Sequence, residues 1–469
     1  MQTPDELISK MNGFSIDYFL VNVRNDRSDF YSVPEDFLNK KEGYLCLSAT
    51  VMNLIMDGEL KKARDLIDSI PDSDDLYAYF MKAGLTFVHP EVTFREVIKI
   101  LKDIKEKGAR LTHVILTAGR PYLLNGFNDF SRLAVFLPKH RELFIEYLAC
   151  IYEKELCPYI YNLCLAEYYY QQNRLIDAQL LASTTIKKFD IESERRIMFS
   201  ALYLRSKILL ATGNTVSSKS FIKDIRNLVK KSGNEEFSYN IDAAEILFAL
   251  YEGKTEEIAK WLKKDAPDEY ADFNMLDLYR YMIKMRCYIS IKNYAAVIAL
   301  AERLRPLLEQ GKRSMDLCEL DVLLAMNLYL SDKKKQAFTA LKRSLKLARL
   351  HRYYRIIADE GSLMLNLLLE YKKESEDSDF IIKLIEMTRE TAIRLPFYLM
   401  EQKDSNNRFT KMETDVLRLL EQGKTKEEIA EMFFISVNTV RFHIKNIYSK
   451  LEVDRPHQAV WQAKVRGII

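Results

Sequence analysis

The sequence has little glycine and proline. Its 469 residues include 14 Gly and 11 Pro, about 5 % together against an average of about 12 %. Because both residues interrupt regular structure, their scarcity favours long helices joined by short turns. Apolar residues make up 48 % and charged residues 29 % of the chain, a balance that excludes a disordered protein. The composition predicts a mostly helical protein of about two to four domains.

Further absences narrow the class of protein. The six cysteines form no CxxC pair, which predicts reduced thiols and a cytoplasmic location. No apolar run approaches the ~18 residues of a membrane span, and the first residues lack the order of a signal peptide. The six histidines show no HExxH or other ligand spacing. We therefore expect no membrane contact, no catalytic residue, no metal and no cofactor.

The net charge of +3 is too small to make the whole chain a binder of polyanions.

Cys150, Cys157 and Cys164 recur every seven residues, but Pro158 interrupts the helix between them. Buried structural thiols are therefore favoured over a metal site.

Pairs of small residues recur twelve positions apart along the chain. The pairs are Ala166/Ala178, Ser206/Ser218 and Ala325/Ala337, with a weaker copy at Val51/Ala63. A polar turn lies between the members of each pair, and small residues at these points let two antiparallel helices approach closely. A degenerate unit at 287–304 carries Lys284 where the small residue is expected.

Such helix pairs bury their apolar faces by stacking on one another, which produces a solenoid. The fold class predicted is all-α, with a tetratricopeptide-like α-solenoid over residues 41–400, although the repeats exceed the 34-residue norm. An irregular helical bundle is the alternative. We expect a concave face rich in Tyr159, Tyr161 and Tyr168–Tyr170, although some of these tyrosines must be core because three in a row span most of the circumference of a helix. Residues 1–40 remain unassigned. Two polar stretches, 372–379 and 401–408, are predicted to be joints, and the second is predicted to link the solenoid to residues 409–469.

Local signals divide residues 409–469 into four short helices. Thr410 with Glu413 and Thr425 with Glu428 form two capping boxes. Ser436 is predicted to cap a third helix, and Asp454, ahead of Pro456, a fourth. Only Phe434, Ile435 and Ser436 separate the second helix from the third, which is the tight joint of a helix–turn–helix.

The third helix has two contrasting faces. At 100° per residue, Val440, Ile444, Ile447 and Leu451 share one face and are predicted to point inward. Between Ser436 and Leu451 there are three basic residues and no acidic residue. A helix packed against the solenoid with solvated charges is the alternative, but the caps, the joint and both faces favour DNA binding. We predict base contacts by Arg441, Phe442 and Lys445, with Asn438 and Asn446 beside them, and phosphate contacts by Thr425, Lys426, Thr439, Lys450 and Arg455.

These residues resemble the LuxR-type helix–turn–helix domain. The family's usual elements stand at Glu413, Val416-Leu417, Gly423, Glu428-Ile429-Ala430, Ile435-Ser436, Thr439-Val440, His443, Lys450-Leu451, Arg455 and Ala459-Val460. Met412 and Phe434 depart from the family pattern. The resemblance implies a bacterial transcription regulator that binds double-stranded DNA, acts on RNA polymerase and forms a homodimer on DNA through its fourth helix.

Residues 347–368 are similar to the end of the helical-repeat sensor of large ATP-dependent LuxR regulators of the maltose-regulon-activator type, and Thr117–Arg132 resembles another of their segments. Those regulators carry an ATPase with a P-loop, but Gly253-Lys254-Thr255 and Gly423-Lys424-Thr425 lack the earlier glycine that such a loop needs. We expect a non-enzymatic regulator, either naturally short or truncated, controlled by a small-molecule or protein effector of the solenoid. The alternative is an interaction scaffold with a vestigial DNA-binding domain.

Overall fold

The computed structural model is helical, with no strand in the part of the chain that it describes. The chain divides into two compact units: unit 1 comprises residues 1–250 and 254–357, and unit 2 comprises 251–253 and 358–469. The structure describes residues 2–11, 26–71, 75–89, 91–107, 136–149, 153–188, 195–232, 238–271, 273, 277–374, 378–395, 398–399, 409, 411–433, 435–451, 453–465 and 468–469. The predicted linker 401–408 and the segment Thr117–Arg132 lie outside these residues.

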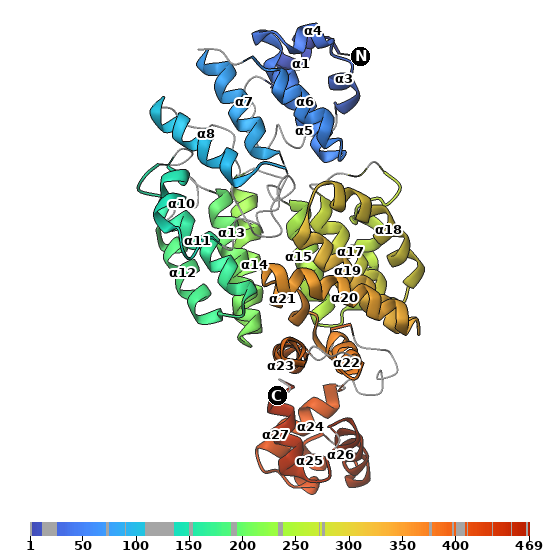
Figure 1. The fold of residues 1–469 in the computed structure, drawn as a ribbon. Helices are drawn as coiled ribbons and strands as arrows, with labels where there is room; N and C mark the ends of the chain where they lie inside the picture. Colours follow the sequence, from blue (N-terminus) through green and yellow to red (C-terminus); the bar gives the residue numbers. More distant parts are fainter. Residues whose placement is uncertain are drawn as a thin grey trace. The chain divides into compact units, whose positions relative to one another are not determined.

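Unit 1 consists of helices that pack mainly on their neighbours in the chain (Figure 1). Its helices are α1 (Pro4–Met11), α3 (Arg27–Tyr31), α4 (Glu35–Leu38), the 3₁₀ turn η1 (Lys41–Gly43), α5 (Tyr44–Met56), α6 (Leu60–Ser69), α7 (Leu76–Val88), α8 (Phe94–Glu106), α10 (Arg141–Leu148), α11 (Cys157–Gln171), α12 (Leu175–Lys188), α13 (Arg195–Ala211), α14 (Thr215–Ser232), α15 (Ser238–Tyr251), α16 (Thr255–Lys264), α17 (Leu278–Ser290), α18 (Tyr294–Gln310), α19 (Ser314–Leu330), α20 (Lys334–His351) and α21 (Tyr354–Ala358). The stacking of successive helix pairs confirms the predicted tetratricopeptide-like fold.

The predicted small-residue pairs lie at the contacts between paired helices. Both members of all four pairs are at most 1 % exposed. Between α13 and α14 the contact is reciprocal: the Ser206 hydroxyl donates to the Ser218 carbonyl at 2.8 Å, and the Ser218 hydroxyl donates to the Ser206 carbonyl at 2.7 Å. Small side chains therefore allow the close approach on which the prediction rested.

One turn geometry joins the helices of each pair. The second residue after the first helix has a positive φ, and the next N–H bonds back to a carbonyl five residues earlier, as in Asn214 N to Leu209 O at 2.8 Å. This is the Schellman arrangement, which satisfies carbonyls left open at a helix end. The positive-φ positions are Gly58, Asn173, Gly213, Gly253, Lys292 and Asp332. The GKT match at Gly253 is thus a repeat turn.

The turn geometry also corrects the register that the sequence predicted for the degenerate unit at 287–304. Aligned on Lys292, the positions equivalent to the small pair are Met285 and Val297, both fully buried. Lys284 is one residue out of that register. Its ammonium lies 2.8 Å from Glu269 and donates to the Pro267 carbonyl at 2.7 Å, so it holds the loop before α17 rather than a helix contact.

Residues 1–40, which the sequence left unassigned, supply helices that cover α5. The helices α1, α3 and α4 each contact α5. Leu7 and Phe30 are buried, and the Thr50 hydroxyl on α5 donates to the Phe30 carbonyl at 3.3 Å. The described residues of this part of the chain, 2–11 and 26–40, therefore belong to the packed structure of unit 1.

Most of the tyrosines predicted for the concave face are core residues, as was expected for some of them. Tyr161, Tyr168 and Tyr170 are buried, and the Tyr161 hydroxyl donates to the Leu137 carbonyl at 2.6 Å. Tyr159 and Tyr169 are half-buried. Three successive tyrosines cover most of the circumference of a helix, so the helix contacts on either side of α11 take up most of them.

Unit 2 contains one further helix pair, α22 (Gly361–Lys372) and α23 (Ser378–Arg394), whose members pack on each other. The polar stretch 372–379 therefore connects two packed helices, and its prediction as a joint between parts of the chain is wrong. The Tyr398 hydroxyl donates to the buried Glu360 carboxylate at 2.7 Å. Unit 2 also contains the helices α24 (Lys411–Glu421), α25 (Lys426–Phe433), α26 (Val437–Leu451) and α27 (Pro456–Val465).

Candidate nucleic-acid interface

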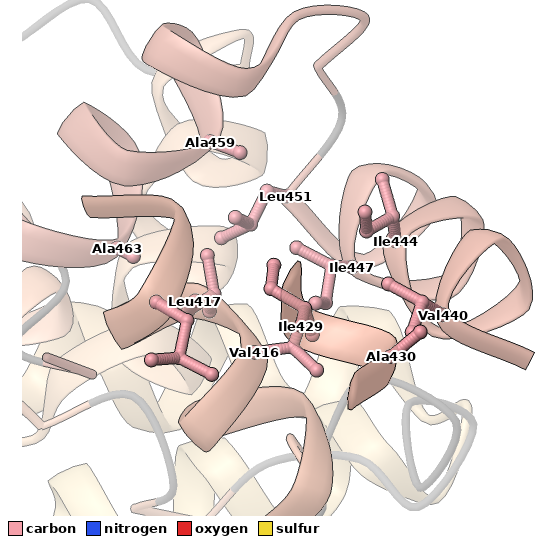
Figure 2. Packing of buried hydrophobic residues seen from close by; sticks show 11 residues of the cluster. Val416, Leu417, Ile429, Ala430, Val440, Ile444, Ile447, Leu451, Ala459 and Ala463 are labelled. Atoms are coloured by element: carbon pink, nitrogen blue, oxygen red, sulfur yellow. The ribbon is translucent and has the colours of Figure 1, made fainter. Parts of the chain in front are cut away.

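The inward face of α26 has been predicted correctly. Val440, Ile444, Ile447 and Leu451 are at most 5 % exposed. They join residues of the other three helices in one apolar cluster (Figure 2), which includes Val416, Leu417, Leu419, Ile429, Ala430, Ala459 and Ala463. Burial of this stripe sets the rotation of α26 about its axis and so determines which side chains it presents outward.

Local caps set the ends of these helices. The Thr425 N–H donates to the Glu428 carboxylate at 2.8 Å, and the Glu428 N–H donates to the Thr425 hydroxyl at 3.2 Å, which confirms the capping box at α25. Hydrogen bonding to Thr425 keeps the pKa of Glu428 below its usual range. Ser436 accepts from the Thr439 N–H at 3.1 Å and caps α26 as predicted.

The first predicted capping box stays a prediction, because Thr410 lies outside the described residues. Its other member, Glu413, is buried within α24, where its carboxylate accepts from Lys450. Helix α27 begins at Pro456, so Arg455 and not Asp454 holds the cap position. In the described part of the chain the Asp454 carboxylate accepts no hydrogen bond, so the prediction that it caps this helix is wrong.

The outward face of α26 is open. Asn438, Arg441 and Lys445 are exposed, and the Phe442 ring is 60 % exposed. Asn446 is half-buried. The Arg441 guanidinium reaches the Asn438 side-chain oxygen at 3.4 Å, a contact near the limit for a hydrogen bond. Arg441, Phe442 and Lys445 therefore lie together on the exposed side, where the sequence placed its base-contacting residues.

A basic hollow adjoins this face. It has a volume of about 510 Å³ and brings Lys426, at the start of α25, beside Arg441 and Lys445 of α26. The other lining residues are Ile444, Tyr448, Val453 and Asp454. The positive end of a helix dipole and three basic side chains thus share one concavity, an arrangement that attracts anions. Burial raises the pKa of the Tyr448 hydroxyl, so that side chain stays neutral beside them.

The remaining predicted phosphate residues have different surroundings. Thr425 is exposed at the cap of α25, Arg455 is exposed before α27, and Thr439 is half-buried with its hydroxyl 2.8 Å from that of Ser436. Lys450 is mostly buried. Its ammonium lies 2.7 Å from the Glu413 carboxylate, and the two side chains are only 12 % and 3 % exposed.

Sequence reasoning missed the Lys450–Glu413 ion pair. The ammonium also lies 5.5 Å from the centre of the Phe409 ring. At 100° per residue, Lys450 stands about 80° from Val440, at the edge of the inward stripe, whereas Phe442 is about 160° away. The helical angle alone could therefore have indicated that Lys450 turns toward α24.

Unit 1 offers neither a metal site nor a reactive thiol among its described residues. No group of His, Cys, Asp and Glu there could hold a metal ion. Of the three cysteines predicted to be buried, Cys157 is buried, Cys164 is partly so, and Cys150 lies outside the described residues. Cys46, Cys287 and Cys318 are buried as well. Burial raises the pKa of the Cys46 thiol to about 11 and that of Cys164 to about 12, which leaves both unreactive near neutral pH. None of the helices searched in these residues is both long and apolar enough for a bilayer.

Comparisons with known proteins support a helical-repeat region followed by a C-terminal helix–turn–helix domain. Residues 154–374 match the family described as MalT-like TPR region, and residues 407–463 match bacterial regulatory proteins, luxR family. The transcriptional regulatory protein LiaR of Bacillus subtilis is 51 % identical over 53 residues, 11 % of this chain and 25 % of LiaR. The HTH-type transcriptional regulator MalT of Vibrio campbellii is 23 % identical over 323 residues, 62 % of this chain and 34 % of MalT. The regulatory protein SdiA of Escherichia coli is 41 % identical over 61 residues, 13 % of this chain and 25 % of SdiA. The chain thus spans about a quarter to a third of the length of these relatives.

Proposed function

Since residues 154–374 form a MalT-like TPR region and residues 407–463 a luxR-family domain, we propose that this chain is a DNA-binding transcription regulator. Its C-terminal helices would read double-stranded DNA, and its helical-repeat unit would control that reading. The relatives named above are themselves transcriptional regulators. The observation that carries the proposal is the open face of α26, held outward by the burial of the opposite stripe.

The chemistry of that face suits the major groove. A major groove admits one α-helix, and an arginine in it can bind a guanine through two parallel hydrogen bonds. Arg441 is exposed and long enough for this role, and Lys445 lies one turn further along α26. An exposed Phe442 ring is unfavourable in water, but in the groove it can contact the methyl group of thymine. Asn438 would add a side-chain amide at the start of the same helix.

Phosphate contacts would come from the rim. Lys426 faces the hollow, Thr425 and Thr439 lie at helix starts, and Arg455 is exposed before α27. Cations and helix N-termini hold phosphates and fix the register of a protein on the duplex. We assign Lys450 a positioning role instead, because its ammonium is held by Glu413 within the domain.

The proposal extends to partners. A small-molecule or protein effector would bind the helical-repeat unit, two copies would pair on DNA through α27, and the bound dimer would act on RNA polymerase in the cytoplasm. Val460 and the 61 % exposed Trp461 lie on α27. An exposed tryptophan is typical of a protein–protein contact, which favours this helix as the dimer surface.

The direct test is selection of duplexes from a random-sequence library with the purified full-length chain. We expect one enriched motif with two half-sites about 10 base pairs apart or a multiple of that spacing. Its affinity should fall linearly with salt on a logarithmic plot. Enrichment of no motif, together with binding that does not respond to salt, would favour an interaction scaffold with a vestigial DNA-binding domain.

Arg441→Ala should weaken binding to the selected duplex by about 1–3 kcal/mol, since a bidentate guanine contact contributes that much discrimination. The loss should be confined to one base pair per half-site, where the variant accepts substitutions that the parent rejects. Competition assays with singly substituted duplexes measure this. Arg418→Ala is the control, because Arg418 is exposed on α24 and does not line the basic hollow. An equal loss on every duplex would contradict the base contact.

Phe442→Ala should remove discrimination for thymine at one position and leave the salt dependence of binding unchanged, because the ring carries no charge. Duplexes with uracil in place of thymine lack the methyl group and provide the matched comparison. The parent should bind them more weakly, whereas the variant should not distinguish them. If the parent binds both duplexes equally, the phenyl ring does not read the methyl group.

A further inference from the structure

The helix α20 of unit 1 is strongly basic. Its 18 residues include six Lys and Arg and no Asp or Glu. Lys335, Lys342, Lys346 and Arg349 are exposed. By contrast, the exposed charges of α16 include Glu256 and Glu257 beside its lysines. The absence of acidic residues thus distinguishes α20 from α16.

Three of these lysines form a line. At 100° per residue Lys335, Lys342 and Lys346 lie within about 40° of one another, and Arg349 continues the line. At a rise of about 1.5 Å per residue, the line from Lys335 to Arg349 is about 21 Å long. We call Lys335, Lys342 and Lys346 the basic stripe. Among the described residues, no carboxylate forms an ion pair with any of the three.

The stability of the helix does not account for this charge. Lys334 and Lys335 lie in the first turn, which contains no acidic residue, although the positive end of the helix dipole disfavours cations there. Lys342 and Lys346 stand four residues apart, and like charges at that spacing repel. The sequence therefore accepts a cost to the helix in order to keep the charge on one face. Binding of an anionic partner would remove that cost.

We propose that the basic stripe binds the phosphate backbone of duplex DNA, as a second contact outside the luxR-family domain. This inference rests on the proposed function, which brings the chain to DNA. The stripe is straight, made of flexible lysines and without aromatic or amide groups, so it is suited to a regular row of phosphates and not to base edges. Duplex DNA presents one charge per about 1.7 Å of its axis, enough for every lysine of the stripe along its length.

Salt dependence of DNA binding tests this on the full-length chain. The probe is a random-sequence duplex of about 40 base pairs, and its dissociation constant is measured across a range of KCl concentrations. Each phosphate contact contributes about 0.9 to the slope of log affinity against log salt. The triple variant Lys335→Gln, Lys342→Gln, Lys346→Gln should therefore lower the slope by about 2–3.

A matched variant removes the same net charge elsewhere. Lys260, Lys263 and Lys264 are exposed on α16, and their replacement by glutamine should leave the slope within about 0.5 of the parent value. Lys426→Gln reports on the luxR-family domain separately and should lower the slope by about one. Circular dichroism melting should find both triple variants folded, since neither removes an ion pair.

The outcomes separate the two proposals. If the α20 variant keeps the parent slope while Lys426→Gln lowers it, the basic stripe does not bind DNA and the proposed function stands. An equal loss in both triple variants would mean that net charge alone acts, which also overturns the stripe. If the parent chain shows no salt-dependent binding, the proposed function fails and the stripe proposal fails with it. A slope loss confined to the α20 variant, alongside a normal Lys426→Gln effect, supports both.

Discussion

Lys450→Ala is expected to lower the unfolding free energy of the luxR-family domain by about 3–5 kcal/mol, the usual cost of removing one partner of a buried ion pair. The Glu413 carboxylate, 3 % exposed, loses a cation 2.7 Å away. Water cannot fully solvate the carboxylate at that depth, so the folded state carries the cost. The effect should far exceed that of any surface ion pair in the same domain.

Hydrogen exchange of the amides in α24–α27 measures this in the intact chain, because protection factors report the free energy of opening of each part. Arg418→Ala is the matched control. It removes an exposed pair with Asp415 at 3.5 Å and should change the opening free energy by less than about 1 kcal/mol.

A double variant distinguishes packing from charge. Replacing Lys450 by Met and Glu413 by Leu should recover most of the lost stability, since apolar residues of similar volume can replace a buried pair. If Lys450→Ala instead leaves exchange unchanged and weakens binding to all duplexes alike, then Lys450 is a phosphate contact, as the sequence first indicated, and its positioning role is wrong.

Arg355→Ala is expected to loosen unit 1 at one place. The Arg355 side chain is 1 % exposed, its guanidinium donates to the Asn173 side-chain oxygen at 3.2 Å, and it lies 5.5 Å from the centre of the Tyr170 ring. These contacts join α21 to the α11–α12 turn across 182 positions of sequence. Truncation removes a large buried side chain and a cation–π contact together, at a cost of about 3 kcal/mol or more.

The loss should be local. Amides of α11 and α12 should exchange faster in the variant, whereas those of α17–α20 should keep their protection. Arg174→Ala is the control from the same turn, because its guanidinium is exposed, pairs with Asp177 at 2.8 Å and stacks on Tyr169. It should change protection by less than about 1 kcal/mol. If Arg355→Ala instead made amides exchange faster throughout unit 1, the contact would not be local.

Patterns that act over a few residues were read correctly from the chain. The pairs Ala166/Ala178 and Ser206/Ser218 could be recognised because close helix packing requires small residues at a fixed spacing. The capping box of Thr425 and Glu428 and the cap by Ser436 are contacts across three residues. The inward stripe of α26 follows from 100° per residue, so its outward face follows too. The resemblance of residues 407–463 to the luxR family rests on patterns of the same short range.

Local patterns were misread where a nearby contact replaced the expected one. Lys284 was placed in the small-residue position, but the positive φ of Lys292 sets the register one residue later. That pattern of spacing was compatible with two registers, and packing against another helix selected one of them. For Glu413 the spacing predicted a cap together with Thr410 but not the buried ion pair with Lys450, which the packing of α24 on α26 adds.

Contacts between distant residues required the tertiary structure. Lys450 meets Glu413 across 37 positions, and Arg355 meets Asn173 across 182. No periodicity links such residues, because their distance depends on how intervening helices stack and not on the geometry of one helix. Helix content, repeat turns and the reading face arise from short-range sterics and hydrogen bonding, which a sequence displays directly. Which charged side chains are buried together depends on the packing of whole helices, and only the folded chain decides it.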